Sequence, residues 1–223
     1  MAITEERLRQ TFSERLRVGA TAGVGGAQEI YQEVKAGGDF LGFARRYAFS
    51  KDYRVARSAL WGLTKANKEE LKQLQVIANE LIDQAMTTGN SSVRRLTLNI
   101  IERLRVGERS SGMRLEIKED DGEHQSPDLR TDFLDFCFEH MMDVKELPGI
   151  QSVCMKLAFR MCKFFAERSD GAERYPELMD ELMRMLEAME TDYYKPAVRC
   201  VRNKILSGTA ERRQNVRPTP TRT

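Results

Sequence analysis

The side chains with the widest chemical scope in this sequence are two histidines and four cysteines. Cys137 and His140 are three residues apart, a spacing at which a thiol nucleophile and its base could face each other on a helix. Cys137 also belongs to an apolar stripe with Phe133 and Met141, which predicts a buried and inert thiol. We therefore expect no catalytic residue at this pair.

A metal site would require ligands at characteristic spacings. His124 and His140 do not form a His-x-x-x-His motif or an equivalent one, and no two cysteines have Cys-x-x-Cys spacing. The cysteines are spread over several helical segments, which predicts buried thiols in a reducing compartment rather than a disulfide framework. They are Cys137, Cys154, Cys162 and Cys200. We expect no metal, no cofactor and a cytoplasmic protein.

A glycine-rich segment and a group of carboxylates are the other candidates for chemistry. The segment Gly19 to Gly26 is similar to a phosphate-binding loop, but it has no following Lys-Ser/Thr and no preceding strand. It predicts a flexible joint between helices. The carboxylates of Asp132, Asp135, Glu139 and Asp143 spread over one helix face, whereas paired acid–base catalysis would need buried carboxylates.

A set of basic residues recurs along the chain at comparable places. Its members are Arg54, Arg57, Arg94, Arg95, Lys156, Arg160, Arg199 and Arg202. Stacked units could align them into a ridge that binds phosphates. Alternatively, they pair with aspartates and with helix C-terminal carbonyls of neighbouring units. We favour the second interpretation because the surroundings of these residues are equally acidic, and the first stays open.

Three aromatic residues are candidate contacts for a partner. Trp61 is the single tryptophan, and Val55 and Leu63 can fill a core stripe that leaves the indole ring to one side. The ring could then lie on a binding surface, although packing against a neighbouring helix is the interpretation we favour. Tyr193 and Tyr194 are adjacent, so they could form a binding edge or cover the end of the molecule.

Helical periodicity dominates the chain and decides where these side chains lie. Apolar residues recur at steps of three and four, which places them along one face of a helix. Thr4 is suited to cap a first helix, and Pro176 to begin a late one. The stripes lie at Leu8 to Leu16, Glu69 to Met86, Val93 to Leu104, Phe133 to Val144, Ile150 to Phe165 and Leu178 to Met189. The alternating segment Met113 to Lys118 is strand-like but has no evident partner.

Two segments of the chain repeat each other without a gap. Asp52 to Leu63 aligns with Asn90 to Ile101 at an offset of 38 residues, so that a capping residue, a valine, an arginine and the apolar positions coincide. Looser copies begin at Gln151 and Asp192. We count four two-helix units, and we expect them to stack because one helix pair cannot bury its apolar stripe alone.

On these repeats the chain resembles the HEAT-like and armadillo-type family of α-helical repeat proteins. The resemblance implies an all-α fold, a right-handed α-solenoid of stacked antiparallel helix pairs. We expect a single domain over residues 1–206, with N-terminal helices in 1–50, repeats in 51–206 and a polar loop insertion at 107–127. We expect residues 207–223 to form a disordered basic tail.

The family resemblance implies little chemistry, because a repeat of this kind specifies packing rather than a reaction. We expect a non-enzymatic scaffold that binds another protein on one face of the helices. The alternative is a nucleic-acid-binding protein related to alkylpurine DNA glycosylases. The net charge of +2 gives no global attraction to nucleic acid, and no apolar run is long enough for a membrane span.

Overall fold

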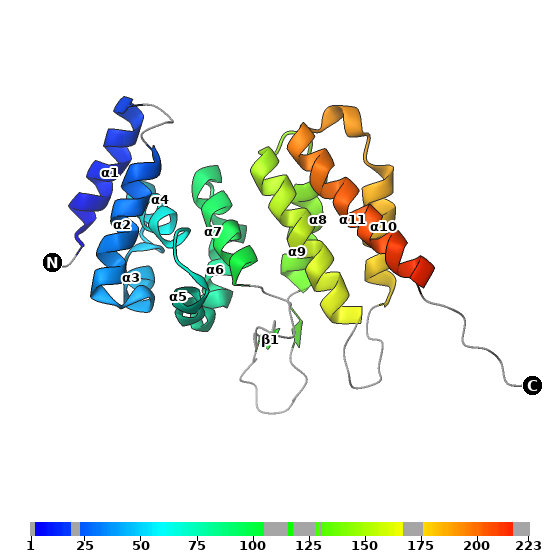
Figure 1. The fold of residues 1–223 in the computed structure, drawn as a ribbon, viewed down its shortest axis with the longest axis horizontal. Helices are drawn as coiled ribbons and strands as arrows, with labels where there is room; N and C mark the ends of the chain where they lie inside the picture. The colour runs from blue at the N-terminus through cyan, green and yellow to red at the C-terminus, as the bar shows by residue number, and fades with distance from the viewer. Residues whose placement is uncertain are drawn as a thin grey trace, which may run out of the picture. The chain divides into compact units, whose positions relative to one another are not determined.

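The computed structural model describes residues 3–18, 23–104, 116–117, 128–129, 131–166 and 176–215. Helices make up almost all of the described chain, which confirms the all-α expectation (Figure 1). Contacts divide the chain into two compact units, unit 1 over Met1–Phe133 and unit 2 over Leu134–Thr223. The expected single domain, the right-handed sense and the antiparallel pairing of the helices stay predictions.

Unit 1 holds seven described α-helices and one 3₁₀ helix ahead of α8. They are α1 (Glu5–Val18), α2 (Gly23–Gly37), α3 (Phe40–Tyr47), α4 (Tyr53–Leu63), α5 (Lys68–Lys72), the 3₁₀ helix η1 (Gln73–Ile77), α6 (Ala78–Thr87) and α7 (Ser91–Arg103). Helix α4 lies at the centre of this unit, where it packs against α1, α2, α3 and α7. Helices α6 and α7 pack against each other as a pair.

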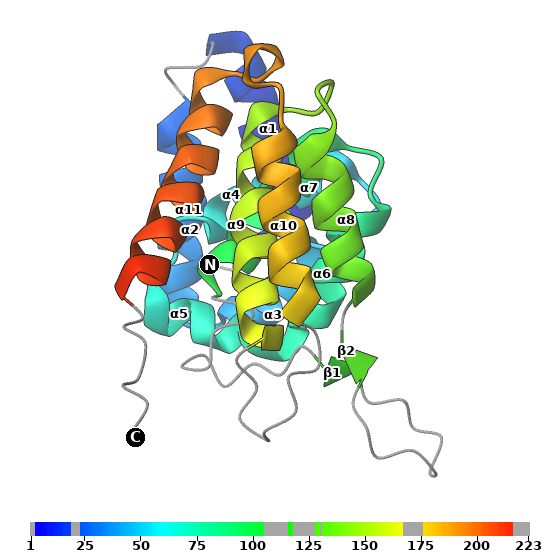
Figure 2. The ribbon, with the colours of Figure 1, turned by 90° about the vertical axis from the view of Figure 1, so that its right-hand side faces the viewer.

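The described part of unit 2 holds four α-helices and a short 3₁₀ helix. They are α8 (Thr131–Met142), whose first turn contains the boundary between the units, α9 (Pro148–Ala166), α10 (Pro176–Ala188), η3 (Thr191–Tyr193) and α11 (Pro196–Asn215). Helix α9 packs against both α10 and α11. In Figures 1 and 2, α9 and α11 form one layer of this unit, and α8 and α10 lie behind them.

The two aligned repeats begin with the same local structure. Asp52 caps α4 by accepting a hydrogen bond from the Arg54 amide, and Asn90 caps α7 by accepting bonds from the amides of Ser92 and Val93. In each case a hydroxyl two residues earlier accepts from the amide of the cap, at 3.2 Å for both Ser50 and Thr88. The aligned residues thus satisfy helix N-terminal amides in matching ways.

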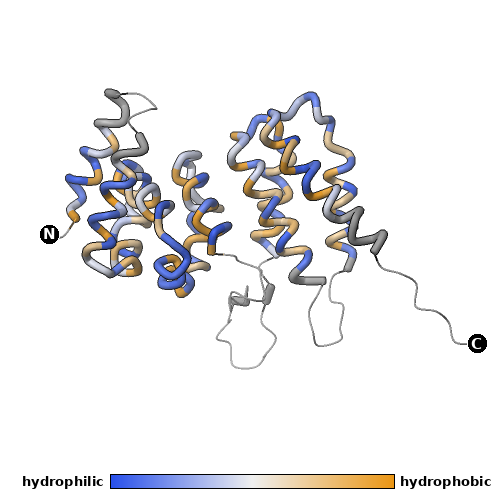
Figure 3. Tube along the Cα trace, in the orientation of Figure 1, coloured by the Kyte–Doolittle hydropathy of each residue, from blue (hydrophilic) through white to orange (hydrophobic). Residues whose placement is uncertain are grey.

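Each helix buries one apolar face, as the periodicity predicted, and Figure 3 shows hydrophobic residues recurring along every helix. Leu60 and Leu98 of unit 1 and Leu157 and Leu182 of unit 2 are fully buried. A fully buried leucine contributes about 1.5–3 kcal/mol relative to an exposed one, so these faces supply most of the stabilisation. No helix in the described ranges has the length and apolar character needed to cross a bilayer.

The single helix predicted from Glu69 to Met86 is wrong, because the segment is broken into α5, η1 and α6. Leu71, Leu74 and Ile77 are all buried and follow one another at steps of three. A 3₁₀ helix has three residues per turn, so it keeps such residues on one face where an α-helix would rotate them apart. The period of the core residues therefore explains the 3₁₀ segment.

The flexible joint predicted at Gly19 to Gly26 is also wrong in its second half, because α2 begins at Gly23. The absence of a side chain is needed at Gly26, where a Cβ atom would lie 2.8 Å from Cγ2 of Thr11. Glycine here serves the close approach of α2 to α1 rather than flexibility. Residues 19–22 lie outside the described ranges.

Two other expectations need correction. The strand-like segment does have a partner, since β1 (Glu116–Ile117) pairs antiparallel with β2 (Asp128–Leu129); the rest of the 107–127 insertion lies outside the described residues. The tail expected to be disordered from residue 207 is helical through Asn215, because α11 continues that far. Residues 210–214 are good helix formers, and the first proline after them is Pro218.

Candidate interaction surface

Arg54 and Arg94 both have partners within their own repeats. Arg54 forms a two-point contact with the Asp52 carboxylate, at 3.0 Å from Nε and 2.9 Å from Nη2. Arg94 donates to the carbonyls of Ala85 and Thr88 at the C-terminal end of α6, at 3.1 and 2.7 Å. Such carbonyls have no intrahelical partner, and they carry the negative end of the helix dipole. The kinds of partner are those of our favoured interpretation, an aspartate and helix C-terminal carbonyls, but they belong to the same repeat rather than to a neighbouring one.

The Asp52 carboxylate links the N-terminus of α4 to α1 electrostatically. It accepts from Arg54 and, at 2.9 Å, from Nε of Arg9 on α1. These two guanidinium groups, Arg54 first, hold the pKa of Asp52 well below its usual range. The carboxylate therefore stays ionised, so both pairs persist at neutral pH.

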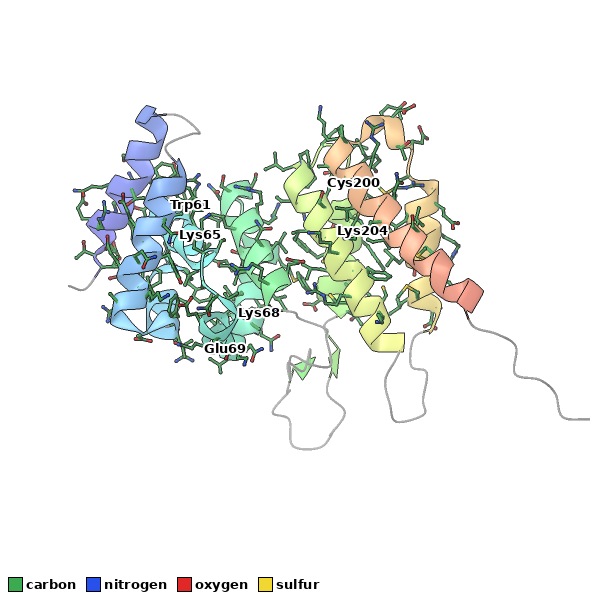
Figure 4. All side chains as sticks on the ribbon, in the orientation of Figure 1. Trp61, Lys65, Lys68, Glu69, Cys200 and Lys204 are labelled. Carbon is green, nitrogen blue, oxygen red and sulfur yellow. The ribbon has the colours of Figure 1, made fainter. Side chains whose placement is uncertain are left out.

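Arg57 and Trp61 are brought together on α4, one turn apart. The Arg57 guanidinium lies 5.0 Å from the ring centre of Phe12 and 5.9 Å from that of Trp61, within the range of cation–π attraction. Arg57 is buried, and Trp61 is half-buried beside Gly26 of α2. Figure 4 labels Trp61 near Lys65, which follows α4. The indole therefore packs against a neighbouring helix, and a contact with a partner stays a prediction.

Arg95, the aligned counterpart of Arg57, behaves differently. It is half-buried on α7, and among the described residues it forms no hydrogen bond, ion pair or ring contact. An arginine without an internal partner can bind a partner molecule. A binding role for Arg95 stays a prediction.

Arg103 is a structural arginine that our reasoning from the sequence did not single out. Its guanidinium donates to the carbonyls of Thr64 and Ala66 just past the end of α4. This contact joins α7 to α4, as Arg94 joins α7 to α6. The one indication in the sequence was the position of Arg103 near the end of a predicted helix. The carbonyls that accept its hydrogen bonds are brought near it only by folding.

In unit 2, Arg202 has the same structural role as Arg94. Its Nε donates to the carbonyl of Leu186 at 2.5 Å, and Nη2 to that of Glu187 at 3.4 Å, near the end of α10. Arg199 lies one turn before Arg202 on the same side of α11, half-buried and without a hydrogen-bond or ion-pair partner among the described residues.

Lys156 and Arg160 lie one turn apart on α9, on the stripe opposite its buried residues. Lys156 is exposed, with no ion pair or hydrogen bond of its side chain in the described chain, whereas Arg160 is half-buried and already makes an internal contact. On α11, Cys200 and Lys204 are likewise one turn apart and exposed, and Figure 4 labels them together. Sequence reasoning missed Lys204 and wrongly placed Cys200 among the buried thiols. Ala197 and Lys204, one turn before and one turn after it, are exposed as well, so this face of α11 packs against nothing that would bury the thiol.

The two adjacent tyrosines have different environments. Tyr194 is buried, and its hydroxyl donates to the carbonyl of Met142 at 2.8 Å, so that η3 is tied to the end of α8. Burial raises the pKa of this phenol. Tyr193 is 68% exposed. Tyr194 thus closes the end of unit 2, and Tyr193 is the one available to a partner.

The buried thiols are unsuited to nucleophilic chemistry. Burial raises the pKa of Cys162 to about 12 and that of Cys137 well above its usual value, the latter also through Cys154. His140 does not serve Cys137, because its Nδ1 lies 2.6 Å from Oε2 of Glu146. This confirms the prediction of a buried, inert Cys137. No group of three or more potential ligand side chains within the described chain could hold a metal ion.

Charge is segregated by helix in a way that the sequence did not reveal. In unit 2, α8 has three acidic and no basic residues, and α10 has four acidic residues and one arginine, a net charge of −3 each. Helix α9 has three basic and no acidic residues, and the same holds for α11 up to Gly208, a net charge of +3 each. In unit 1, α6 has two acidic residues and α7 three arginines and one glutamate, net −2 and +2.

Comparison with known proteins identifies the repeats. The profile described as the HEAT repeat domain matches residues 12–116 and 121–209, together 194 of the 223 residues. No curated protein and no solved structure matches the chain. The match confirms the resemblance drawn from the aligned segments.

Proposed function

Because this chain belongs to the HEAT repeat family, we propose that it is a non-enzymatic scaffold that binds a protein partner on one face of its helices. The family membership carries this proposal, since repeats of this kind generally serve as protein-interaction surfaces. Cytoplasmic location is part of it, consistent with free thiols at Cys137, Cys154 and Cys162.

The distribution of roles among the polar side chains also supports a scaffold. Arg94 and Arg202 bind carbonyls at the ends of neighbouring helices and join α7 to α6 and α11 to α10, while Arg54 binds the Asp52 carboxylate at the start of its own helix. Arg95 and Lys156 have no such internal task among the described residues. Taking each unit by itself, we propose that a partner contacts the basic helix α7 of unit 1 or the basic helices α9 and α11 of unit 2; α11 carries a further cation of this kind, Lys204. Neither the geometry nor the comparisons support the DNA glycosylase alternative.

Site-specific photo-crosslinking in the source cells tests this proposal. A photoreactive amino acid replaces Asn99 on α7 or Cys200 on α11, and in matched controls it replaces Glu80 on α6 or Glu139 on α8. We expect discrete protein adducts from the positions on the basic helices and none from the two controls. The adducts are identified by mass spectrometry.

Two outcomes would overturn the proposal. Adducts that disappear on nuclease treatment would show that these helices bind a nucleic acid rather than a protein. Equal yields from all four positions, or no adduct at any of them, would show that the basic helices have no specific protein partner. Because the control positions are exposed, poor accessibility cannot explain their lack of adducts.

A further inference from the structure

The surface formed by α9 and α11 of unit 2 has exposed cations and no acidic residue in its described part. Lys156 on α9 and Lys204 on α11 are both exposed, and their side chains form no hydrogen bond or ion pair with the described residues. On the same side of α9, at successive turns, Lys156 is followed by Arg160 and Lys163, which are half-buried. We call this set, with Lys204, the α9–α11 surface.

Both helices carry an exposed lysine, and the two helices pack against each other in unit 2. Val198 and Ile205 form the buried side of α11, and Arg202 marks the side that faces α10. Lys204 lies on a different side of the helix from Arg202, and Cys200 is one turn before it. Figures 1 and 2 show α9 and α11 next to each other in one layer, and Figure 4 places Lys204 on its open side.

Opposite net charges on neighbouring helices attract each other, so the alternation of charge itself stabilises the packing. This explains why α9 and α11 are basic where α8 and α10 are acidic. This attraction does not explain why Lys156 and Lys204 are exposed and form no ion pair in the described chain. A lysine that pairs with nothing in its own chain gains most from a carboxylate supplied by another molecule.

Building on the proposed function, we propose that the α9–α11 surface binds an acidic segment of the partner protein, with Lys156 and Lys204 as its anchoring cations. Phe159 and Val201 are half-buried on these same two helices. They give apolar contact to a segment in which Asp or Glu alternates with small apolar residues. Charge complementarity sets the orientation of the segment and speeds its association.

A protein segment fits this surface better than a nucleic acid. Duplex DNA carries one charge per about 1.7 Å of its axis, so it would extend past two lysines to the helices α8 and α10, each with a net charge of −3. Single strands gain affinity from aromatic rings on which bases stack. The exposed ring in the described part of unit 2 is that of Tyr193, on η3 rather than on α9 or α11.

Fluorescence anisotropy with defined probes tests the inference on the full chain. The probes are labelled peptides of sequence (Glu-Ala-Asp-Ala)₃ and (Gln-Ala-Asn-Ala)₃, and a 12-nucleotide oligothymidylate. We expect the acidic peptide to bind at 20 mM salt, to weaken about tenfold by 200 mM salt, and to bind more tightly than either other probe. The double substitution Lys156→Gln and Lys204→Gln should weaken it about fivefold.

The matched control is Lys145→Gln with Arg184→Gln, which removes the same charge from the same unit at exposed positions off the surface. Its affinity should stay within twofold of the parent. Equal loss in both double variants would show a bulk charge effect and overturn the inference, as would tighter binding of oligothymidylate. If the crosslinked partner has no acidic segment, the scaffold proposal stands and this inference fails.

Discussion

The two units are built from the same kind of repeat but use their charges differently. In unit 1, ion pairs join the helices: Arg7 of α1 binds Glu29 of α2 at 2.8 Å, and Arg9 of α1 binds Asp52 before α4 at 2.9 Å. In unit 2, α8 and α10 have a net negative charge and α9 and α11 a net positive one, and the side chains of Lys156 and Lys204 have no partner in the described chain. Unit 1 thus uses several of its ion pairs to join helices, whereas unit 2 separates most of its charges between helices.

This difference shows that a repeat fixes where an arginine lies but not what it binds. Arg57 and Arg95 occupy aligned positions. The first is enclosed by Phe12 and Trp61, and the second has no internal partner among the described residues. The neighbouring helix decides between a structural and an available cation. If the comparison is correct, substitutions in unit 1 should cost stability, while those of exposed cations in unit 2 should affect binding.

The largest effect is expected at the closest helix contact of unit 1. Gly62→Ala would place a Cβ atom 2.4 Å from Cγ2 of Ile30, whose branched side chain is fully buried and stiff. We expect a loss of about 1–3 kcal/mol in the free energy of unfolding. Urea denaturation measures the loss, and hydrogen exchange should assign it to α4 rather than α9.

Gly208→Ala is the matched control in unit 2, because its Cβ would meet nothing within 4 Å. This helical position should gain about 0.5–1 kcal/mol from the replacement of glycine. Equal destabilisation by the two substitutions would contradict the close packing of α2 against α4.

Removal of the buried guanidinium should be the next largest effect. Arg57→Ala loses the contacts with Phe12 and Trp61 and leaves a space beneath α1. We expect a loss of about 2 kcal/mol, and a much smaller loss for the exposed Arg54→Ala. Thermal unfolding of both variants measures the difference. Similar losses would mean that Arg57 is not part of the core.

In unit 2 the strongest single polar contact tested is that of Tyr194. Tyr194→Phe leaves the Met142 carbonyl without its 2.8 Å donor, and we expect a loss of about 1 kcal/mol. Tyr193→Phe should have no measurable effect on stability, because that side chain is exposed. Urea denaturation of the two variants distinguishes them, and the reverse order would refute the assignment of roles.

The smallest effect should depend on pH. The lowered pKa of Asp52 means that its ionised form stabilises the fold above the unfolded-state pKa of about 3.9, and that this contribution is lost as pH falls below about 4. Asp52→Asn keeps a cap but removes the charge, so it should cost about 0.5–1 kcal/mol at pH 7.

The difference between parent and Asp52→Asn should shrink at pH 3, as measured by urea denaturation at both values. Asn90→Ser alters the aligned cap without an ionisable group, so its cost should be the same at pH 3 and pH 7. A cost of Asp52→Asn that did not change with pH would argue against the ion pairs with Arg9 and Arg54.

Periodicity predicted the helices well where apolar residues follow the α-helical period. The stripe from Ile150 to Phe165 became α9, and Pro176 begins α10 as expected. The prediction of a single helix after Glu69 was wrong because the core residues of that segment recur at steps of three. A hydrophobic period averaged over the whole stripe hides this local change. The sequence allowed the hypothesis that Arg94 and Arg202 bind helix carbonyls. It could not identify the acceptor residues, because these carbonyls belong to other helices. The net charge of each helix can be counted only when the helix boundaries are known, so the segregation of charge could not be predicted from the sequence.

The alternation of charge also affects how unit 2 moves before it touches anything. Two layers of packed helices, about 8–10 Å apart and of opposite net charge, form an electric dipole across the thickness of the unit. An approaching anionic surface exerts a torque on this dipole and turns the α9–α11 layer toward itself. Substitutions that weaken the dipole should therefore slow association more than they speed dissociation, even at positions that never contact the partner.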